Sequence, residues 1–198
     1  MTSNEAKMQS ILNANNGIIT TSQVTDAGIP RRCLSTMVQS GIIQRIGRGV
    51  YASPEAWPDE MFLIQSRFAK GIFSHETSLY LHGMSDRTPM RYTMTFPFGY
   101  NTGNAKRQQI IAKLSTLENY ELGIIQLTSP GGSLVRTYDI ERTLCDIVKT
   151  RHNADIQVVN QAMKLYADSK DKNIAKLMDY ADKLRVKPKV LNYMEVLL

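Results

Sequence analysis

Apolar residues recur at helical spacing through the first forty positions, and three short helices are predicted there. They run from about Asn4 to Ala14, from Thr20 to just before Gly28, and from Pro30 to about Gln39. Thr20, with Gln23 three positions later, has the capping-box pattern that begins a helix. Gly28 ends that helix, and the ring of Pro30 suits the first position of the next one. The pattern therefore predicts a compact helical start to the chain.

The third predicted helix separates into two faces, and a β-prone segment follows it. Leu34, Met37 and Val38 lie on the apolar face at helical spacing. The opposite face carries hydrogen-bonding side chains and no acid: Arg32, Ser35, Thr36 and Gln39. Residues 41–52 then form two short runs around a Gly-Arg-Gly turn, which is typical of a β-hairpin. Helices followed by such a hairpin predict a winged helix-turn-helix, with the hairpin as its wing.

Beyond residue 58 the pattern indicates a mixed α/β region followed by helices. Residues 92–96 alternate polar and apolar positions, which predicts a half-buried strand. Further strands are expected over residues 124–127 and 134–138, and helices from Asp139 to the end. The predicted class is α+β: an N-terminal winged helix-turn-helix domain (residues 1–53) and a larger mixed α/β C-terminal domain (residues 58–198) that ends in several helices. Pro54 and Pro58 bound the link between the two, and Trp57 within it is expected to pack between them.

Composition narrows the functional classes. The chain has 198 residues, 24 lysines and arginines, 18 acids and a formal net charge of +6, which favours an anionic partner. No apolar run reaches the length of a membrane span, and the first residues lack a signal-peptide pattern. The cysteines, Cys33 and Cys145, are far apart and are expected to be buried thiols in a reducing compartment. A cytoplasmic protein without membrane contact is therefore expected.

Charge in the third helix and hairpin points to double-stranded DNA. The segment from Pro30 to Ala52 contains four arginines and no acid. In helix-turn-helix proteins the N-terminal residues of the second helix of the motif contact base edges. The expected DNA-binding residues are Arg31, Arg32, Ser35, Thr36 and Gln39 on the helix, and Arg45 and Arg48 on the wing at phosphates or the minor groove. A solvated arginine face is the alternative interpretation.

Other clusters indicate less chemistry. His75 and His82 are seven positions apart, which does not suit a shared metal ion, and His82 is expected to hydrogen-bond locally. Asp139, Glu141 and Asp146 resemble a nuclease's acidic cluster, although acids also suit the start of a helix. No metal, cofactor or enzymatic activity is therefore expected. Further cations either extend the DNA footprint, face a protein partner or are solvated: Lys106, Arg107, Lys149, Arg151, Arg185, Lys187 and Lys189.

Four stretches together resemble the AbiEi antitoxins of bacterial abortive-infection toxin–antitoxin systems. They are Gly41–Tyr51, Phe73–Gly83, Tyr92–Pro97 and Tyr138–Asp146. The resemblance implies a transcriptional autorepressor whose N-terminal domain binds inverted repeats upstream of its own operon, with two copies on one operator. It also implies that the C-terminal domain counteracts an AbiEii-type toxin, which resembles a nucleotidyltransferase, without forming a stable complex. The arginines at 31, 32, 45 and 48 match the family's basic DNA-binding face.

Two other functions remain open from the sequence. One is a DNA-directed, nuclease-like enzyme that uses the acidic cluster of the second domain. The other is a ligand-responsive repressor whose second domain binds a small effector.

Overall fold

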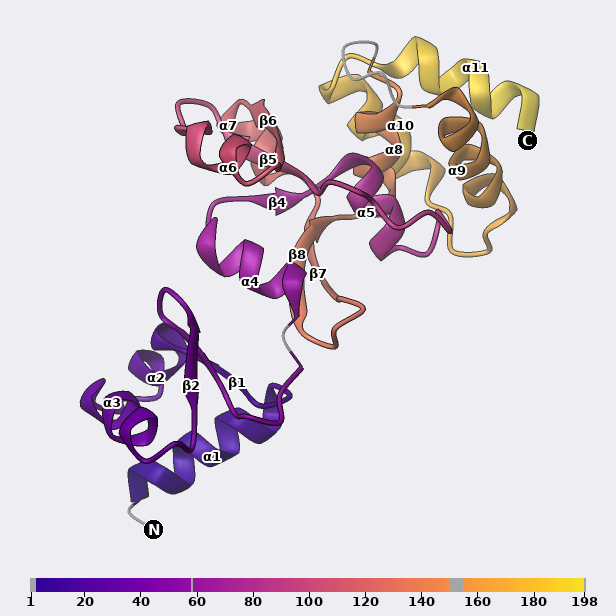
Figure 1. Cartoon of the computed structure of the whole chain (residues 1–198). Coiled ribbons are helices and arrows are strands. Elements are labelled where there is room, and N and C mark those ends of the chain that lie inside the picture. The colour runs from indigo at the N-terminus through magenta and orange to yellow at the C-terminus, as the bar shows by residue number, and fades with distance from the viewer. Residues whose placement is uncertain (1–2, 58, 150–154, 198) are drawn as a thin grey trace. The chain divides into compact units, whose positions relative to one another are not determined.

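A computed structural model describes residues 3–57, 59–149 and 155–197 (Figure 1). The chain divides into two compact units, each with a sheet of its own. The first unit comprises Met1–Ala69 and Thr128–Leu134, and the second comprises Lys70–Leu127 and Val135–Leu198. Helices and strands occur in both units, so the predicted α+β class is confirmed. The division into functional domains at residues 1–53 and 58–198 stays a prediction.

The first unit combines short helices with a small antiparallel sheet. Its elements are α1 (Ser3–Ala14), β1 (Ile18–Thr20), α2 (Thr21–Asp26), α3 (Arg32–Gln39), β2 (Gln44–Gly47), β3 (Val50–Ala52) and α4 (Glu60–Arg67). The strand order is β1-β3-β2, with both pairings antiparallel. The sequence did not indicate β1, because a strand of three residues is too short to show a periodicity.

Local signals explain most of these helix boundaries. The capping box is formed as predicted: Gln23 N donates to Thr20 Oγ1 (3.2 Å), and Thr20 N donates to Gln23 Oε1 (2.8 Å). The third helix begins at Arg32 instead of Pro30, and Arg31 occupies its cap position without a side-chain cap bond. Leu34 and Met37 are buried as expected. Val38 is 37% exposed, so its predicted place on the inner face is wrong.

The core of the first unit joins the first three helices to the sheet. Its buried residues are Met8, Leu12, Ile19, Val24, Ile29, Leu34, Met37 and Ile43. Backbone hydrogen bonds stabilise the turn between α3 and β2, since Ile42 N and Ile43 N both donate to Met37 O (3.0 and 3.3 Å). Trp57 does not belong to this core. It is 86% exposed, and its expected packing between the domains stays a prediction.

Asp59 connects α4 to a turn that is distant in the sequence. Its Oδ1 accepts a hydrogen bond from Phe62 N (3.1 Å), which caps α4. Its Oδ2 accepts bonds from Ser133 N (3.1 Å) and from the Ser129 hydroxyl. A Cβ at Gly131 would lie 2.6 Å from Asp59 Cγ, so only glycine fits there without a shift. This clasp explains why residues 128–134 and α4 group with the first unit.

The second unit is built on a mixed five-stranded sheet. Its elements are β4 (Ile72–Phe73), α5 (His75–Leu81), β5 (Thr93–Pro97), α6 (Gly103–Arg107), β6 (Ile111–Ser115), α7 (Leu117–Glu121), β7 (Ile124–Thr128), β8 (Leu134–Tyr138), α8 (Ile140–Ile147), α9 (Ile156–Asp168), α10 (Ile174–Lys183) and α11 (Lys187–Leu197). The strand order is β6-β5-β4-β8-β7. The β4–β5 pair is antiparallel, whereas β4–β8 and β5–β6 are parallel.

The expected run of helices at the end of the chain forms the larger core. In Figure 1, α8 to α11 lie together at the C-terminal end of the second unit. Leu144, Met163, Leu177 and Val190 each come from a different one of these helices, and all are fully buried. No helix among the described residues is both long and apolar enough to cross a bilayer.

The strand predicted over residues 92–96 is present, but its half-buried character is wrong. Thr93 and Thr95 are only 5% and 2% exposed. Thr93 N donates to Thr77 Oγ1 (2.8 Å), and Thr95 Oγ1 donates to Ser74 Oγ (2.9 Å). Hydroxyl groups of α5 and its cap residue therefore bond the Thr93 backbone and the Thr95 side chain inside the protein. Ser74 occupies the cap position of α5, but its side chain makes no cap hydrogen bond.

Candidate nucleic-acid interface

The exposed side of α3 is a continuous polar stripe. Arg32, Ser35, Thr36 and Gln39 are all exposed, and they follow the i, i+3, i+4, i+7 spacing that places residues on one helix face. Thr36 Oγ1 donates to Arg32 O (3.2 Å), whereas Leu34 and Met37 point into the core. We call these four residues the α3 stripe. It offers a guanidinium, two hydroxyls and an amide, which are groups that hydrogen-bond to base edges.

Arg31 precedes the stripe at the start of α3. It is exposed, and its Nε donates to Thr25 Oγ1 of α2 (3.2 Å). This single bond connects the two helices and leaves the terminal nitrogens of the guanidinium available. The partner in this contact is a hydroxyl and not a carboxylate, so the contact positions Arg31 and leaves its charge uncompensated.

The β2–β3 hairpin carries the remaining two predicted arginines. Arg45 and Arg48 are both exposed, and Arg45 Nε donates to Gly47 O (3.1 Å). Thr21 holds the hairpin turn against α2, because its backbone N and its hydroxyl both bond to Gly49 O (2.8 and 3.2 Å). Gly49 has φ +72°, and a Cβ there would lie 3.0 Å from Thr21 Oγ1. The structure thus attaches the basic turn directly to the first residue of α2.

The other predicted cations have different surroundings. Lys106 and Arg107 are exposed in the last turn of α6, and Arg185 is exposed after α10. Lys149 pairs with Asp146 (3.4 Å), and Lys187 pairs with Asp182 (3.8 Å).

Lys189 and Arg151 complete the set of predicted cations. Lys189 Nζ donates to Val148 O (3.3 Å), so this ammonium caps the C-terminal end of α8 in the second unit. Arg151 lies outside the described residues. Of the predicted cations that the structure describes, four thus lie at α3 and the β2–β3 hairpin of the first unit, and the others lie at separate positions in the second.

The three acids of the alternative enzymatic site are each tied into the fold. Asp139 caps α8 by accepting from Arg142 N (2.9 Å), and its Oδ2 lies 3.0 Å from Lys176 Nζ. Lys176 also pairs with Glu141 (3.2 Å). Among the residues that the structure describes, no group of three or more His, Cys, Asp or Glu is arranged to hold a metal ion. This geometry gives the nuclease-like interpretation no support.

Asp146, the third acid, forms a buried ion pair with Arg142. The Arg142 Nε lies 3.0 Å from Asp146 Oδ2, and the two side chains are only 1% and 4% exposed. Burial alone would raise the pKa of Asp146, but the charges of His75, Arg142 and Lys149 outweigh it and hold that pKa below its ordinary value. The ion pair leaves Arg142 with no exposed surface to speak of, although arginine is a polar residue. It is among the largest fully buried side chains, which helical spacing alone did not reveal.

The histidines belong to a buried polar network. His82 Nε2 bonds to Tyr138 O (2.8 Å), 56 positions away, so the expected local bond is wrong. Burial lowers the pKa of His82 below its ordinary value, although the Tyr138 carbonyl and two nearby acids oppose this. His75 adopts φ +55°, and its Nδ1 lies 3.0 Å from Ser74 Oγ. The network joins α5 to β8 and is structural.

The cysteines differ from one another. Cys145 is fully buried, and burial raises its pKa to about 12, as expected for an inert thiol. Cys33 is only partly buried on α3, so the expectation of a buried thiol is wrong for this residue.

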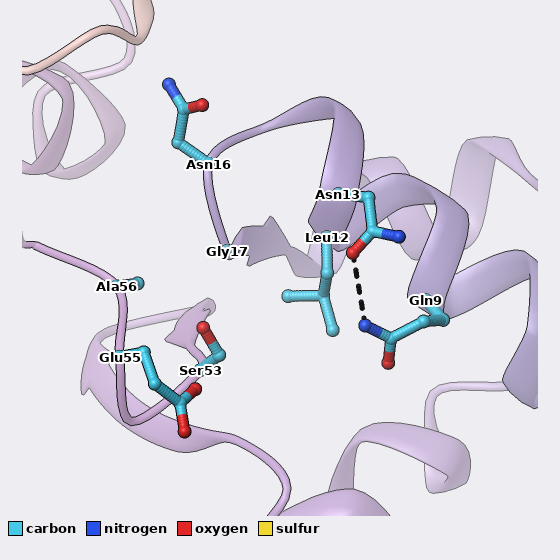
Figure 2. A pocket seen from close by; sticks show the side chains of 8 residues that line it. All are labelled: Gln9, Leu12, Asn13, Asn16, Gly17, Ser53, Glu55 and Ala56. Carbon is cyan, nitrogen blue, oxygen red and sulfur yellow. Dashed lines mark hydrogen bonds between the residues drawn. The ribbon is translucent and has the colours of Figure 1, made fainter.

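A pocket opens in the first unit beside the end of α1 (Figure 2). Its volume is about 500 Å³, and it is lined by Gln9, Leu12, Asn13, Asn16, Gly17, Ser53, Glu55 and Ala56. Amides, a hydroxyl and a carboxylate surround a small apolar part, and Gln9 Nε2 donates to Asn13 Oδ1 (3.2 Å). The sequence gave no signal for this pocket, because its lining comes from two separate segments.

Comparison with known proteins finds a family match in the first part of the chain. The family model for the AbiEi antitoxin transcriptional regulators matches residues 9–54. The resemblance to the AbiEi antitoxins is confirmed. The AbiEi segment contains the α3 stripe and the whole β2–β3 hairpin. The later stretches that contributed to the resemblance, from Phe73 onward, lie outside it.

Structural comparison extends beyond the AbiEi segment. The chain is similar to the crystal structure of the RV2827C protein from Mycobacterium tuberculosis, with 13% sequence identity and a TM-score of 0.51. The alignment covers 98% of this chain and 82% of that one. At this identity the likeness concerns the fold alone. No curated protein matches the chain.

Proposed function

We propose that this protein is a transcriptional autorepressor and antitoxin of the AbiEi type, in which a winged helix-turn-helix binds double-stranded DNA. In this proposal α2 and α3 form the helix-turn-helix, and the β2–β3 hairpin is the wing. The α3 stripe enters the major groove, and Arg31 and Arg32 read base edges near the helix start. Arg45 and Arg48 bind phosphates or the adjacent minor groove.

One observation carries the DNA-binding proposal. Apart from Val38, which is 37% exposed, the exposed side chains of α3 are polar, and the segment from Pro30 to Ala52 contains four exposed arginines and no acid. A DNA backbone favours such a surface through the release of counterions. The match of residues 9–54 to a family of transcriptional regulators supports the same conclusion.

The antitoxin part of the proposal concerns the second unit. The AbiEi family description supports an antitoxin role, and the partner proposed here is an AbiEii-type toxin with a nucleotidyltransferase-like fold, counteracted without a stable complex. We further propose that two copies occupy one operator of inverted repeats. Co-expression of an AbiEii-type toxin with variants of this chain that are changed on the surface of the second unit tests the antitoxin role separately from DNA binding.

The deciding experiment for DNA binding is a titration of the full chain against the duplex upstream of its gene. Binding is measured by fluorescence anisotropy at several salt concentrations, with a scrambled duplex as the competitor. Arg32→Ala is expected to weaken specific binding by roughly 1–3 kcal/mol and to relax specificity. Arg48→Ala is expected to weaken binding to both duplexes and to reduce the salt slope by about one phosphate contact.

A matched control removes an exposed cation of the same unit from another helix. Lys7→Ala on α1 is expected to leave sequence preference unchanged. Equal affinity for the two duplexes, or unchanged binding by both arginine variants, would refute the assignment of the interface. A plasmid incubated with magnesium and the protein tests the nuclease-like alternative, which predicts cleavage.

The pocket in Figure 2 supports a second candidate, a repressor that responds to a small ligand, although it lies in the first unit and the sequence had placed the effector in the second domain. Its lining offers amide oxygens and the Glu55 carboxylate and contains no cation, which suits a donor-rich, positively charged small molecule. Spermidine and arginine are suitable probes. A rise in unfolding temperature that Glu55→Gln removes would support this candidate, and no shift with either probe would count against it.

A further inference from the structure

The strand β6 lies at one end of the sheet in the second unit, so one side of it is open. Its partner is β5, in a parallel register from Thr93↔Ile111 to Pro97↔Ser115. Ile111 N donates to Tyr92 O (2.9 Å), and Ser115 O accepts from Phe98 N (2.7 Å), so residues 111 and 115 bond towards β5. Backbone direction alternates along a strand. Ala112 and Leu114 therefore direct their backbone N–H and C=O groups to the open edge.

Large apolar side chains are exposed beside this edge. Leu114 is 51% exposed, Phe98 is 80% exposed and Leu117 is 63% exposed. They are close in the fold, because the Phe98 amide bonds to Ser115 and Leu117 begins α7 two residues after β6 ends. Open sheet edges favour pairing with another strand unless charge, proline or a covering element prevents it. Here one face of the edge offers apolar contact area to an added strand.

The opposite face of the edge carries a cation, Lys113. Side chains alternate along a strand, so Lys113 lies on the face away from Ala112 and Leu114. Lys113 is partly buried, and burial lowers its pKa while Glu76 of α5 opposes this shift. The exposed Arg91 lies just before β5, and with Glu76 and Ile111 it lines a cavity of about 330 Å³. Arg87 and Asp155 also line this cavity and pair with each other (3.5 Å), so the face carries two acids and three cations.

A second copy of the chain does not suit the edge. Consider two β6 strands that pair antiparallel and overlap fully. Ala112 of each copy would then bond to Leu114 of the other copy. The strand centres would then coincide, with Lys113 opposite Lys113. Like charges directly opposite one another destabilise a strand pair, whereas opposite charges stabilise it.

We propose that the β6 edge accepts an extended segment of a partner protein, with an acidic residue opposite Lys113 and apolar residues on either side of it. The backbone of the segment bonds to Ala112 and Leu114, its apolar side chains cover Leu114, and its carboxylate pairs with the lysine. This mode of recognition is strand addition. The inference goes beyond the proposed function and does not depend on DNA binding by the first unit.

The test uses the full chain and two short synthetic peptides of alternating valine and threonine. One carries a central glutamate and the other a central lysine. Fluorescence anisotropy is expected to show the glutamate peptide binding on the order of fivefold more tightly. Hydrogen exchange is expected to slow at the Ala112 and Leu114 amides and to stay unchanged at the Lys113 amide, which faces β5.

Charge variants make the test specific to the strand. Lys113→Glu is expected to reverse the preference between the peptides, and Lys113→Gln to remove it. Lys113→Glu places a second acid near Glu76. If that variant does not fold, Lys113→Gln still tests the proposal. Lys164→Glu on the exposed side of α9 changes the net charge equally and is expected to keep the original preference.

Three results would overturn the inference. Equal binding of the two peptides would remove the charge argument, and an equal effect of Lys164→Glu would show non-specific attraction. A dimer in sedimentation that Leu114→Asp dissociates would show that a second copy occupies the edge.

Discussion

Arg142 is the side chain whose removal should most damage the second unit. It is 1% exposed, and its Nε pairs with Asp146 Oδ2 at 3.0 Å. One terminal nitrogen donates to Leu122 O (3.2 Å) and to the Asn119 carbonyl, and the guanidinium lies 4.4 Å from the centre of the Tyr138 ring. The informative perturbation is Arg142→Met, which keeps much of the volume and removes the charge and every donor.

The size of the effect follows from what the substitution leaves behind. Asp146 stays buried, with Lys149 at 3.4 Å and the charge of His75 left to compensate it. Removing one partner of a buried ion pair costs about 3–5 kcal/mol, because the other charge stays desolvated. The double variant Arg142→Met/Asp146→Leu should recover part of this loss. The carbonyls of Asn119 and Leu122 still lack their donor in the double variant, so recovery should be incomplete.

A surface pair supplies the matched control. Arg87 and Asp155 are 3.5 Å apart with side chains that are 72% and 45% exposed, so Arg87→Met should cost no more than about 1 kcal/mol. Urea unfolding followed by circular dichroism gives the free energy of unfolding, and hydrogen exchange of the α8 amides assigns the change to the second unit. Similar losses for Arg142→Met and Arg87→Met would refute the reasoning.

The same pair gives an acid dependence. The pKa of Asp146 is lower in the folded protein than in the unfolded chain, where it is about 3.9. Its stabilisation is therefore fully present above the unfolded pKa and is lost as the pH falls through the lower folded value. In the double variant Arg142→Met/Asp146→Leu this part of the acid dependence should be absent.

Three further predictions use glycine, histidine and cysteine positions. In urea unfolding, Gly17→Ala should destabilise the first unit by roughly 1–3 kcal/mol more than Gly28→Ala. Both glycines have positive φ, but only at Gly17 would an added Cβ meet neighbours, since it would lie 2.5 Å from the Ser53 hydroxyl. Similar losses at both glycines would contradict this. Burial lowers the pKa of His82, so as the pH falls the unfolded chain takes up the proton at this residue before the folded protein does. The free energy of unfolding should therefore fall as the pH drops below about 6.5. His82→Gln should flatten this part of the dependence of stability on pH. Iodoacetamide should modify Cys33 faster than the buried Cys145 in the native protein, as read by mass spectrometry, and equal rates would show that the second core opens readily.

The sequence predicted the elements whose signals are local. The capping box of Thr20 and Gln23, the polar spacing of the α3 stripe and the Gly-Arg-Gly turn each depend on residues a few positions apart. Helical and strand periodicity are also local, so the α+β class and the helical end of the chain followed from them. The seven proposed DNA-binding residues were accessible to sequence reasoning for the same reason.

Tertiary structure alone decided the contacts between distant segments. Arg142 reads as an ordinary polar position on a helix, and only the packing of α8 brings it to the carbonyls of Asn119 and Leu122, 23 and 20 positions away. His82 finds its partner 56 residues away, and the strand with Thr95 is buried on both faces because hydroxyls of another segment satisfy it. The open edge of β6 likewise depends on strand order, which periodicity does not encode. Periodicity specifies which face of an element is apolar, whereas the partner of each buried polar group depends on how the whole chain packs.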